Sequence, residues 1–267
     1  MIALHARRSH DSIARFASSY PSRPLVLALT GTDLYRDIRS DTDAKRSLRL
    51  ATRMIVLQEM GLAELTSDLR RITRVIYQST RLIRRAPPLK SCFEVCISGH
   101  LREEKDPFRL AAALKYLPQQ SRIQVTHLGA AMSTAMAAAA RSWMEREPRY
   151  RWVGELPHYL ALRRLARSRL MVISSRMEGG ANVVTEALAA GVPVIASRIP
   201  GNVGMLGADY AGCYEPGRER ALARLLWRAE SDPEFYRKLK RQCGARRCLV
   251  SRKREKQGLK QLLAELD

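Results

Sequence analysis

The stretch ISSRMEGGANVVTEALAAGVPVIAS, from Ile173 to Ser197, decides the fold. It begins at the end of an apolar run, LMVIS, which has the length of one buried strand, and it turns at Gly179 and Gly180. The residues from Asn182 to Ala190 have the composition of a helix, which Gly191 ends. PVIAS then predicts a second buried strand, so the stretch is typical of one unit of a parallel sheet.

A turn of this kind predicts an anion site at the carboxyl edge of the sheet. Free backbone amides and the positive end of the helix lie there, and glycine lets a phosphate approach the backbone closely. Glu178 can accept hydrogen bonds from sugar hydroxyls, and Glu186 can accept a pair from a ribose diol. In the structural alternative, Glu178 only complements the helix dipole and Glu186 is a solvated helix residue.

The rest of the chain alternates short apolar runs with amphipathic ones, which predicts an α/β fold. Two adjacent prolines in RRAPPL, residues 84–89, interrupt the alternation and predict a linker between two lobes. We assign 1–87 to a first lobe, 88–250 to a second lobe, and 251–267 to a C-terminal helix that packs back on the first lobe. The expected strands are Met1–Leu4, Leu25–Leu29, Met54–Leu57, Arg74–Tyr77, Phe93–Ile97, Ile123–His127, Tyr150–Trp152, Leu170–Ile173 and Val192–Ala196.

The first lobe is expected to be incomplete. Met1 opens directly into IALHA, with no cap, turn or polar leader before this first strand. We therefore expect further strands upstream and an exposed sheet edge in the chain as given.

The amino-acid composition and net charge of the chain indicate which kinds of partner it can bind. The chain has 267 residues, 46% of them hydrophobic, and carries 47 Lys and Arg against 26 Asp and Glu, a formal charge of +21. This charge favours an anionic partner: nucleic acid, a membrane surface or a phosphorylated small molecule. No nucleic-acid-binding motif accompanies the dense basic run from Arg246 to Lys260, which we place on a solvated surface helix, so we expect no nucleic acid.

Neither disulfides, a membrane span nor a metal is expected. The five cysteines form no C-x-x-C pair and favour a reducing cytoplasm. No apolar run approaches the roughly 20 residues of a membrane helix, and residues 130–140 predict an alanine-rich soluble helix. The acids of DTD, residues 41–43, could suggest a metal site, but they open a helix, where capping favours acids. We therefore expect no metal and no cofactor besides the substrates.

The run from Ser174 to Ser197 resembles the donor-binding signature of the family-four, GT-B type glycosyltransferases, which have two Rossmann-like, doubly wound lobes facing a cleft. In that family the first glutamate meets the donor sugar and the second meets the ribose of a nucleotide sugar. The resemblance carries these roles to Glu178 and Glu186. It makes the second lobe the donor lobe and the first the acceptor side.

Two further motifs agree with the resemblance. SGHLREEKDP, residues 98–107, is similar to the family's loop whose cations grip the diphosphate, although His100 stands where arginine is usual and Arg102 is the candidate for the second charge. YRWVGELP, residues 150–157, resembles the loop beside the nucleotide base. The catalytic candidates are Glu178, Lys105 and Arg102, and the donor-binding candidates are Gly99, His100, Gly154, Leu156, Ser175, Gly179, Gly180, Ala181, Asn182, Val183 and Glu186.

Five segments together, LHARRS, LTGTDLYRDI, GHLREEKDPFR, SSRMEGGANVV and SRIPGNVG, resemble the selenosugar synthases of selenoneine biosynthesis over essentially the whole chain. That resemblance implies transfer of N-acetylglucosamine from UDP-N-acetylglucosamine to selenophosphate. The wider family often has histidine where this chain has Thr30, and an acceptor that is already anionic needs no such base. The acceptor-binding candidates are Arg7, Arg8, Thr30, Gly31, Asp33 and Arg36, with His5 at a neighbouring strand end.

Two other functions stay open on the sequence. The first is a related transferase with a hydroxyl acceptor on a glycan or lipid, for which the positive charge would serve membrane approach. The second is an inactive remnant that still binds a nucleotide sugar.

Overall fold

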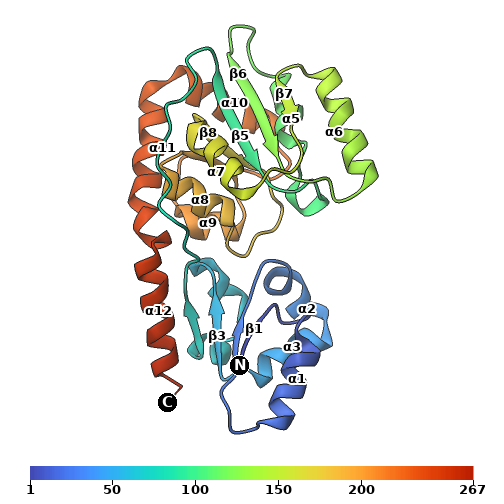
Figure 1. The fold of residues 1–267 in the computed structure, drawn as a ribbon, viewed down its shortest axis with the longest axis vertical. Helices are drawn as coiled ribbons and strands as arrows, with labels where there is room; N and C mark the ends of the chain where they lie inside the picture. Colours follow the sequence, from blue (N-terminus) through green and yellow to red (C-terminus); the bar gives the residue numbers. More distant parts are fainter. Residues whose placement is uncertain (267) are drawn as a thin grey trace.

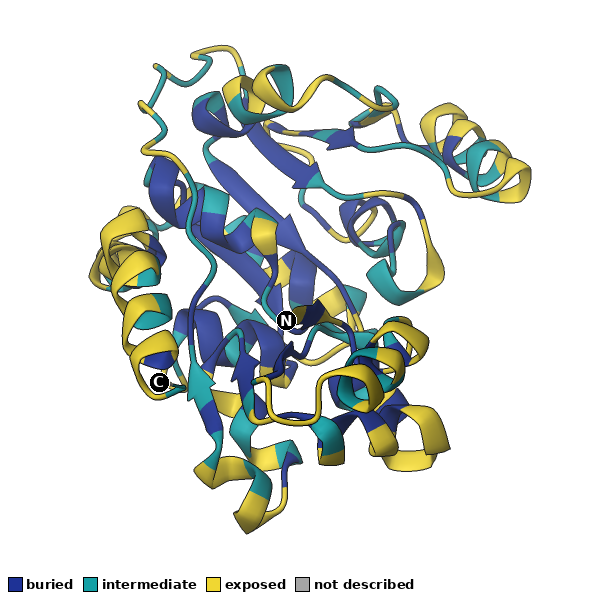
Figure 2. Cartoon of the chain, turned by 60° about the horizontal axis from the view of Figure 1, so that its bottom comes forward, coloured by how far each residue is buried: buried dark blue, intermediate teal, exposed yellow. Residues whose placement is uncertain are grey.

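A computed structural model describes residues 1–266 and arranges them in two α/β lobes, one above the other in Figure 1. Within these residues each lobe has one parallel sheet, with strand order β1-β2-β3-β4 in the first and β10-β9-β8-β5-β6-β7 in the second. The α/β fold with two parallel sheets expected from the sequence is therefore confirmed. Figure 2 shows the buried strands at the centre of each lobe and exposed helices around them.

The first lobe is a small sheet with helices on both faces. Its elements are β1 (Ile2–Leu4), α1 (His10–Ser19), β2 (Val26–Ala28), η1 (Asp33–Asp37), α2 (Ile38–Ser40), α3 (Thr42–Leu50), β3 (Arg53–Val56), η2 (Glu59–Glu64), α4 (Ser67–Arg71) and β4 (Thr73–Val75). Ile13 of α1 and Leu48 of α3 pack with Met54 on one face of the sheet. At the edge strand β1, Ile2 and Leu4 are exposed.

The second lobe is larger and carries the predicted donor signature. Its elements are β5 (Phe93–Ser98), η3 (Glu103–Lys105), α5 (Arg109–Leu114), β6 (Ile123–Leu128), α6 (Thr134–Arg146), β7 (Tyr150–Trp152), α7 (His158–Arg167), β8 (Leu170–Ile173), α8 (Asn182–Ala190), β9 (Val194–Ser197), α9 (Pro200–Leu206), β10 (Cys213–Tyr214), α10 (Glu219–Ser231) and α11 (Pro233–Arg246). β8, α8 and β9 occupy the Ile173–Ser197 stretch. Gly191 ends α8 with a φ of +67°, which glycine adopts readily.

Two segments connect the lobes. Residues 76–90 have no helix or strand and run beside the second lobe, where the backbone N–H of Ala86 donates to the carbonyl of Ala166 (3.2 Å). The chain returns through η4 (Arg247–Val250) and α12 (Arg252–Ala264). Leu262 of α12 packs on the second face of the first sheet, so the C-terminal helix lies against the first lobe (Figure 1). The boundaries at residues 87 and 250 stay predictions.

The structure corrects some local expectations. The basic run from Arg246 to Lys260 does not lie on one helix, because η4 separates α11 from α12 where Leu249 and Val250 are buried. The two-residue strand β10 was not expected, since so short a run has no recognisable period. Within residues 1–266 no helix has the length and apolar character needed to cross a membrane.

Candidate active site

An open pocket of about 680 Å³ lies at the carboxyl ends of β5, β6 and β7 and at the start of α8. This is the edge of a parallel sheet where ligands of open α/β folds bind. The chain supplies the pocket from the loop after β5, the loop after β7 and the first turns of α8. The sequence-predicted residues on its wall are Gly99, His100, Arg102, Lys105, Leu156, Asn182, Val183 and Glu186.

The remaining donor candidates lie beside this pocket. Ser175 lines a small adjoining hollow with Lys105 and Gly99. Ala181 is buried at the start of α8. Gly154 has a φ of +75°, a conformation that favours glycine, and its carbonyl accepts the N–H of Gly129 (2.8 Å). Gly154 thereby shapes the loop after β7.

Glu178 and Lys105, both catalytic candidates, form an ion pair. The same Glu178 oxygen accepts a hydrogen bond from the Ser175 hydroxyl (2.6 Å). The side chains of Glu178 and Lys105 are only 11% and 22% exposed, so solvent screens their attraction less than that of a surface pair. The carboxylate thus holds the cation beside the pocket, where an incoming anion would compete for it.

The Lys105 loop is held by buried groups of the second sheet. Asp106 follows Lys105 with a φ of +44°, and the buried Ser174 hydroxyl donates to the carbonyls of Lys105 (3.0 Å) and Asp106 (2.9 Å). Arg109 then pairs with the Asp106 carboxylate (2.8 Å). Ser174 therefore helps to position Lys105, although the two residues are far apart in the sequence.

Glu186 has a partner that the sequence did not reveal. Nε2 of His158, the first residue of α7, lies 2.8 Å from Glu186 Oε1. Glu186 is 14% exposed and His158 71%, so the imidazole lies on the solvent side of the carboxylate and forms part of the pocket wall. The two residues are far apart in sequence, and the only local signal was that His158 directly follows the GELP motif.

A second histidine, His127, supports the floor of the pocket. Nδ1 accepts the Tyr150 hydroxyl proton (2.7 Å), and Nε2 donates to the carbonyl of Gly99 (3.3 Å). Burial lowers the pKa of His127 from its ordinary value of 6.5 to about 4, so the ring is neutral. It fixes the Gly99 loop beside Gly129, where a Cβ would lie 2.1 Å from the Gly99 oxygen.

The glycine turn of the donor signature contacts the first lobe. A Cβ on Gly179 would lie 2.4 Å from the carbonyl carbon of Thr30, and one on Gly180 would lie 2.6 Å from the Leu57 side chain. A Cβ on Gly31 would in turn lie 2.9 Å from the Gly179 nitrogen. These glycines therefore permit close approach of the two lobes, which the sequence analysis did not anticipate, and their contact with a donor stays a prediction.

Among the acceptor candidates of the first lobe, Asp33 is fully buried and joins two loops. Its carboxylate accepts the N–H (2.8 Å) and hydroxyl (2.7 Å) of Thr30 and the N–H of Ala6 (2.9 Å). His5, with a φ of +70°, accepts the Arg8 N–H at Nδ1 (3.2 Å), so Nε2 donates to the Thr32 hydroxyl (2.9 Å). Asp33 holds the Thr30 loop in place rather than offering a free carboxylate.

The three acceptor-side arginines have different surroundings. Arg7 pairs with Asp41 (3.0 Å) and Arg36 with Asp37 (2.9 Å). The pKa of Arg36 is raised, chiefly by its hydrogen bond to Asp37, with a smaller contribution from the charge of Glu104 in the Lys105 loop. The side chain of Arg8 has no ion-pair partner among residues 1–266.

No metal centre accompanies these groups. Within the described residues, no three His, Cys, Asp or Glu side chains are arranged to hold a metal ion. The Asp41 carboxylate instead caps α3 by accepting the N–H of Ala44 (2.8 Å), which is the role that the sequence predicts for it.

Comparison with known proteins gives the family. A family model described as Glycosyl transferases group 1 matches residues 80–245. No curated protein sequence matches the chain significantly.

Solved structures share the fold at low sequence identity. HepE from Anabaena, solved in complex with UDP and glucose, has a TM-score of 0.76 and 19% identity, covering 96% of this chain and 75% of that one. Sucrose-phosphate synthase from Thermosynechococcus elongatus has a TM-score of 0.77 and 20% identity, covering 99% and 73%. Trehalose-phosphate synthase (UDP-forming) from Burkholderia vietnamiensis has a TM-score of 0.78 and 10% identity, covering 99% and 73%. Because the family model covers more than half of the chain, the protein belongs to the group 1 glycosyl transferases and has the two-lobed GT-B fold.

Proposed function

We propose that the protein transfers a sugar from a UDP-sugar bound in the pocket beside Lys105. The observation that carries this proposal is that two cations, Lys105 and Arg102, line the same pocket as the Glu186 carboxylate. Cations suit a diphosphate, and a carboxylate suits a ribose diol. HepE, which shares the fold, was solved with UDP and with UDP-glucose, which supports the choice of nucleotide.

In the proposed reaction, the bond between the anomeric carbon and the β-phosphate oxygen breaks, and its electron pair leaves with UDP. Lys105 and Arg102 would stabilise the negative charge that develops on the diphosphate. Ser174 already holds the Lys105 backbone beside the pocket, so only the Lys105 side chain, which pairs with Glu178, would have to turn toward the diphosphate. Glu178, released from Lys105 by the incoming diphosphate, would accept hydrogen bonds from the donor sugar.

For the acceptor we propose selenophosphate, and for the donor UDP-N-acetylglucosamine, as the resemblance to selenosugar synthases implies. The anionic selenium would attack the anomeric carbon as UDP leaves, forming a carbon–selenium bond without loss of a proton to the protein. We place this reaction in a reducing cytoplasm, because a selenium nucleophile is readily oxidised and the five cysteines are free thiols.

The surroundings of Thr30 support an acceptor that needs no general base. Both nitrogens of His5 are hydrogen-bonded, and the Asp33 carboxylate accepts three donors. Neither group is free to take a proton from a hydroxyl acceptor. Arg8 and Arg36 supply positive charge on the acceptor side.

Mass spectrometry of the reaction products tests the proposal. The chain is incubated with UDP-N-acetylglucosamine and either selenophosphate, phosphate or glycerol, and the carbohydrate products are compared. A selenium-containing N-acetylglucosamine product with selenophosphate alone is expected. A glycerol glycoside would instead support the hydroxyl acceptor, and UDP binding without any product would support the inactive remnant.

A further inference from the structure

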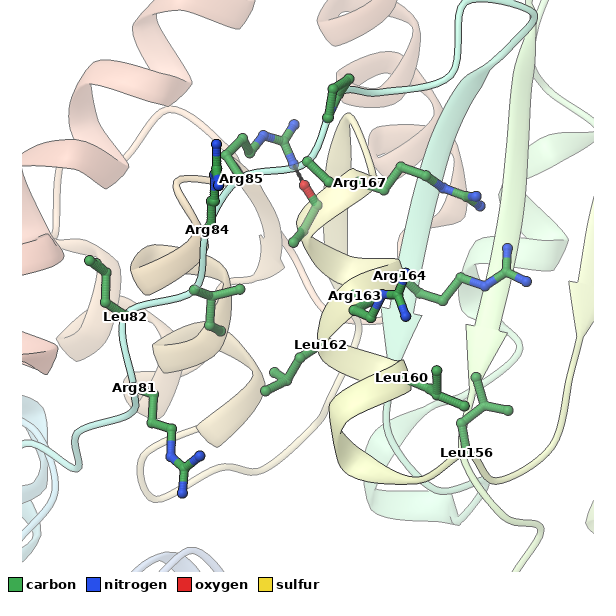
Figure 3. Close-up of a pocket in the computed structure, with 14 residues that line it drawn as sticks. Arg81, Leu82, Arg84, Arg85, Leu156, Leu160, Leu162, Arg163, Arg164 and Arg167 are labelled. Carbon is green, nitrogen blue, oxygen red and sulfur yellow. Dashed lines mark hydrogen bonds between the residues drawn. The ribbon is translucent and has the colours of Figure 1, made fainter.

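A groove of about 1030 Å³ lies on the far side of Leu156 from the pocket that contains Lys105. One side is the linker segment 81–87 and the other is α7, as Figure 3 shows. Six arginines line it and no acid does: Arg81, Arg84 and Arg85 from the linker, and Arg163, Arg164 and Arg167 from α7.

Most of these cations have no internal partner. Arg167 pairs with Glu94 (2.8 Å), and Arg85 donates to the Ala166 carbonyl (2.6 Å), the bond drawn in Figure 3. The side chains of the other four arginines form neither an ion pair nor a hydrogen bond within residues 1–266. Burial lowers the pKa of Arg85, a cost that a bound anion would offset.

Apolar side chains lie on the same face as the cations. Leu156, Leu160 and Leu162 line the groove between the arginines. Leu82 of the linker is 79% exposed, and Tyr159, one helical turn before Arg163 on α7, is 64% exposed. Tyrosine and leucine flanked by arginine are typical of surfaces that enter the headgroup layer of a bilayer.

We propose that this arginine groove docks the protein on an anionic membrane surface, with phosphate headgroups between the linker and α7. A small phosphate ester would use the cations but would leave Leu82 and Tyr159 in water. An anionic bilayer satisfies both the charge and the exposed apolar groups. The proposal does not depend on the acceptor, and the groove adjoins the donor pocket, since Leu156 lines both.

Vesicle co-sedimentation with the full chain tests the proposal. Binding is measured to vesicles of phosphatidylcholine alone and of phosphatidylcholine mixed with phosphatidylglycerol. The groove variant is Arg84→Gln with Arg163→Gln and Arg164→Gln. The matched control replaces three exposed first-lobe arginines, Arg15, Arg46 and Arg49, with glutamine and has the same net charge.

The expected result is binding to the mixed vesicles only. The groove variant should lose about a hundredfold in partitioning, because each arginine near an anionic surface contributes about fivefold. The control variant should lose much less, and Leu82→Ser should weaken binding with no change in charge. UDP binding by all variants reports that the fold is intact.

Two results would overturn the docking proposal. Equal losses for the groove and control variants would mean that only net charge matters. Absence of vesicle binding would refute docking, and if pyrophosphate then binds in the groove, the arginines serve a soluble anion. Neither result bears on transfer from UDP-sugar, which is assayed without vesicles.

Discussion

Replacing Lys105 with methionine removes the cation of the diphosphate loop while keeping an unbranched side chain. A charge-assisted hydrogen bond contributes about 1.5–3 kcal/mol. However, Lys105 pairs with Glu178, and in the proposed complex UDP would exchange that partner for its diphosphate. The net loss should therefore be about 1–2 kcal/mol, or roughly 5- to 30-fold in the Kd for UDP.

Calorimetric titration of the Lys105→Met protein with UDP and with uridine tests this account. Uridine has no diphosphate, so its Kd should stay within about twofold. Lys115→Met, at an exposed position after α5, is the matched control and should bind both ligands as the wild type does. Equal weakening of UDP and uridine, or an equal effect of the control, would refute the role of Lys105.

Three further predictions concern the supports of the site. Gly179→Ala should lower turnover strongly, because its Cβ would lie 2.4 Å from first-lobe backbone; unchanged turnover in steady-state kinetics would contradict the lobe contact. His127 is neutral when folded, with a pKa of about 4 against 6.5 when unfolded. Stability should therefore be full above pH 6.5 and fall by up to about 3 kcal/mol as the pH drops toward 4. Urea unfolding of His127→Gln should show a weaker pH dependence than that of the wild type. His158→Ala should also weaken uridine binding, because it removes the partner of Glu186. In a double-mutant cycle, the same substitution should have no further effect on uridine binding when Glu186 is already alanine.

Much of the second lobe could be predicted from the sequence because its signals are local. An apolar run, a glycine turn and a helix with a glycine end predicted β8 and α8, and the expected strand at Val192–Ala196 was found at Val194–Ser197. The loop with Lys105 was assigned to the donor site by its resemblance to the family's loop, and in the structure it follows β5, which lies in the same parallel sheet as β8. The observed pocket contains Lys105 and the start of α8, whereas Gly179 and Gly180 of the turn contact the first lobe.

The parts that escaped prediction depend on contacts between distant residues. His158 meets Glu186 only because α7 and α8 pack side by side, and their spacing in sequence carries no such information. The glycine turn was interpreted as space for phosphate, whereas in the structure Thr30 and Leu57 of the other lobe occupy the positions where Cβ atoms would lie. The orientation of the two lobes depends on contacts between residues of one lobe and residues of the other, and no local sequence pattern predicts such contacts.

A crystal structure of the chain with bound UDP is the most direct test of the central claim, that the pocket is a UDP-sugar donor site. We expect the diphosphate at Lys105 and Arg102 and the ribose at Glu186, with Lys105 moved away from Glu178. UDP bound elsewhere, or bound in this pocket with the Lys105–Glu178 pair intact and the diphosphate in solvent, would contradict the claim.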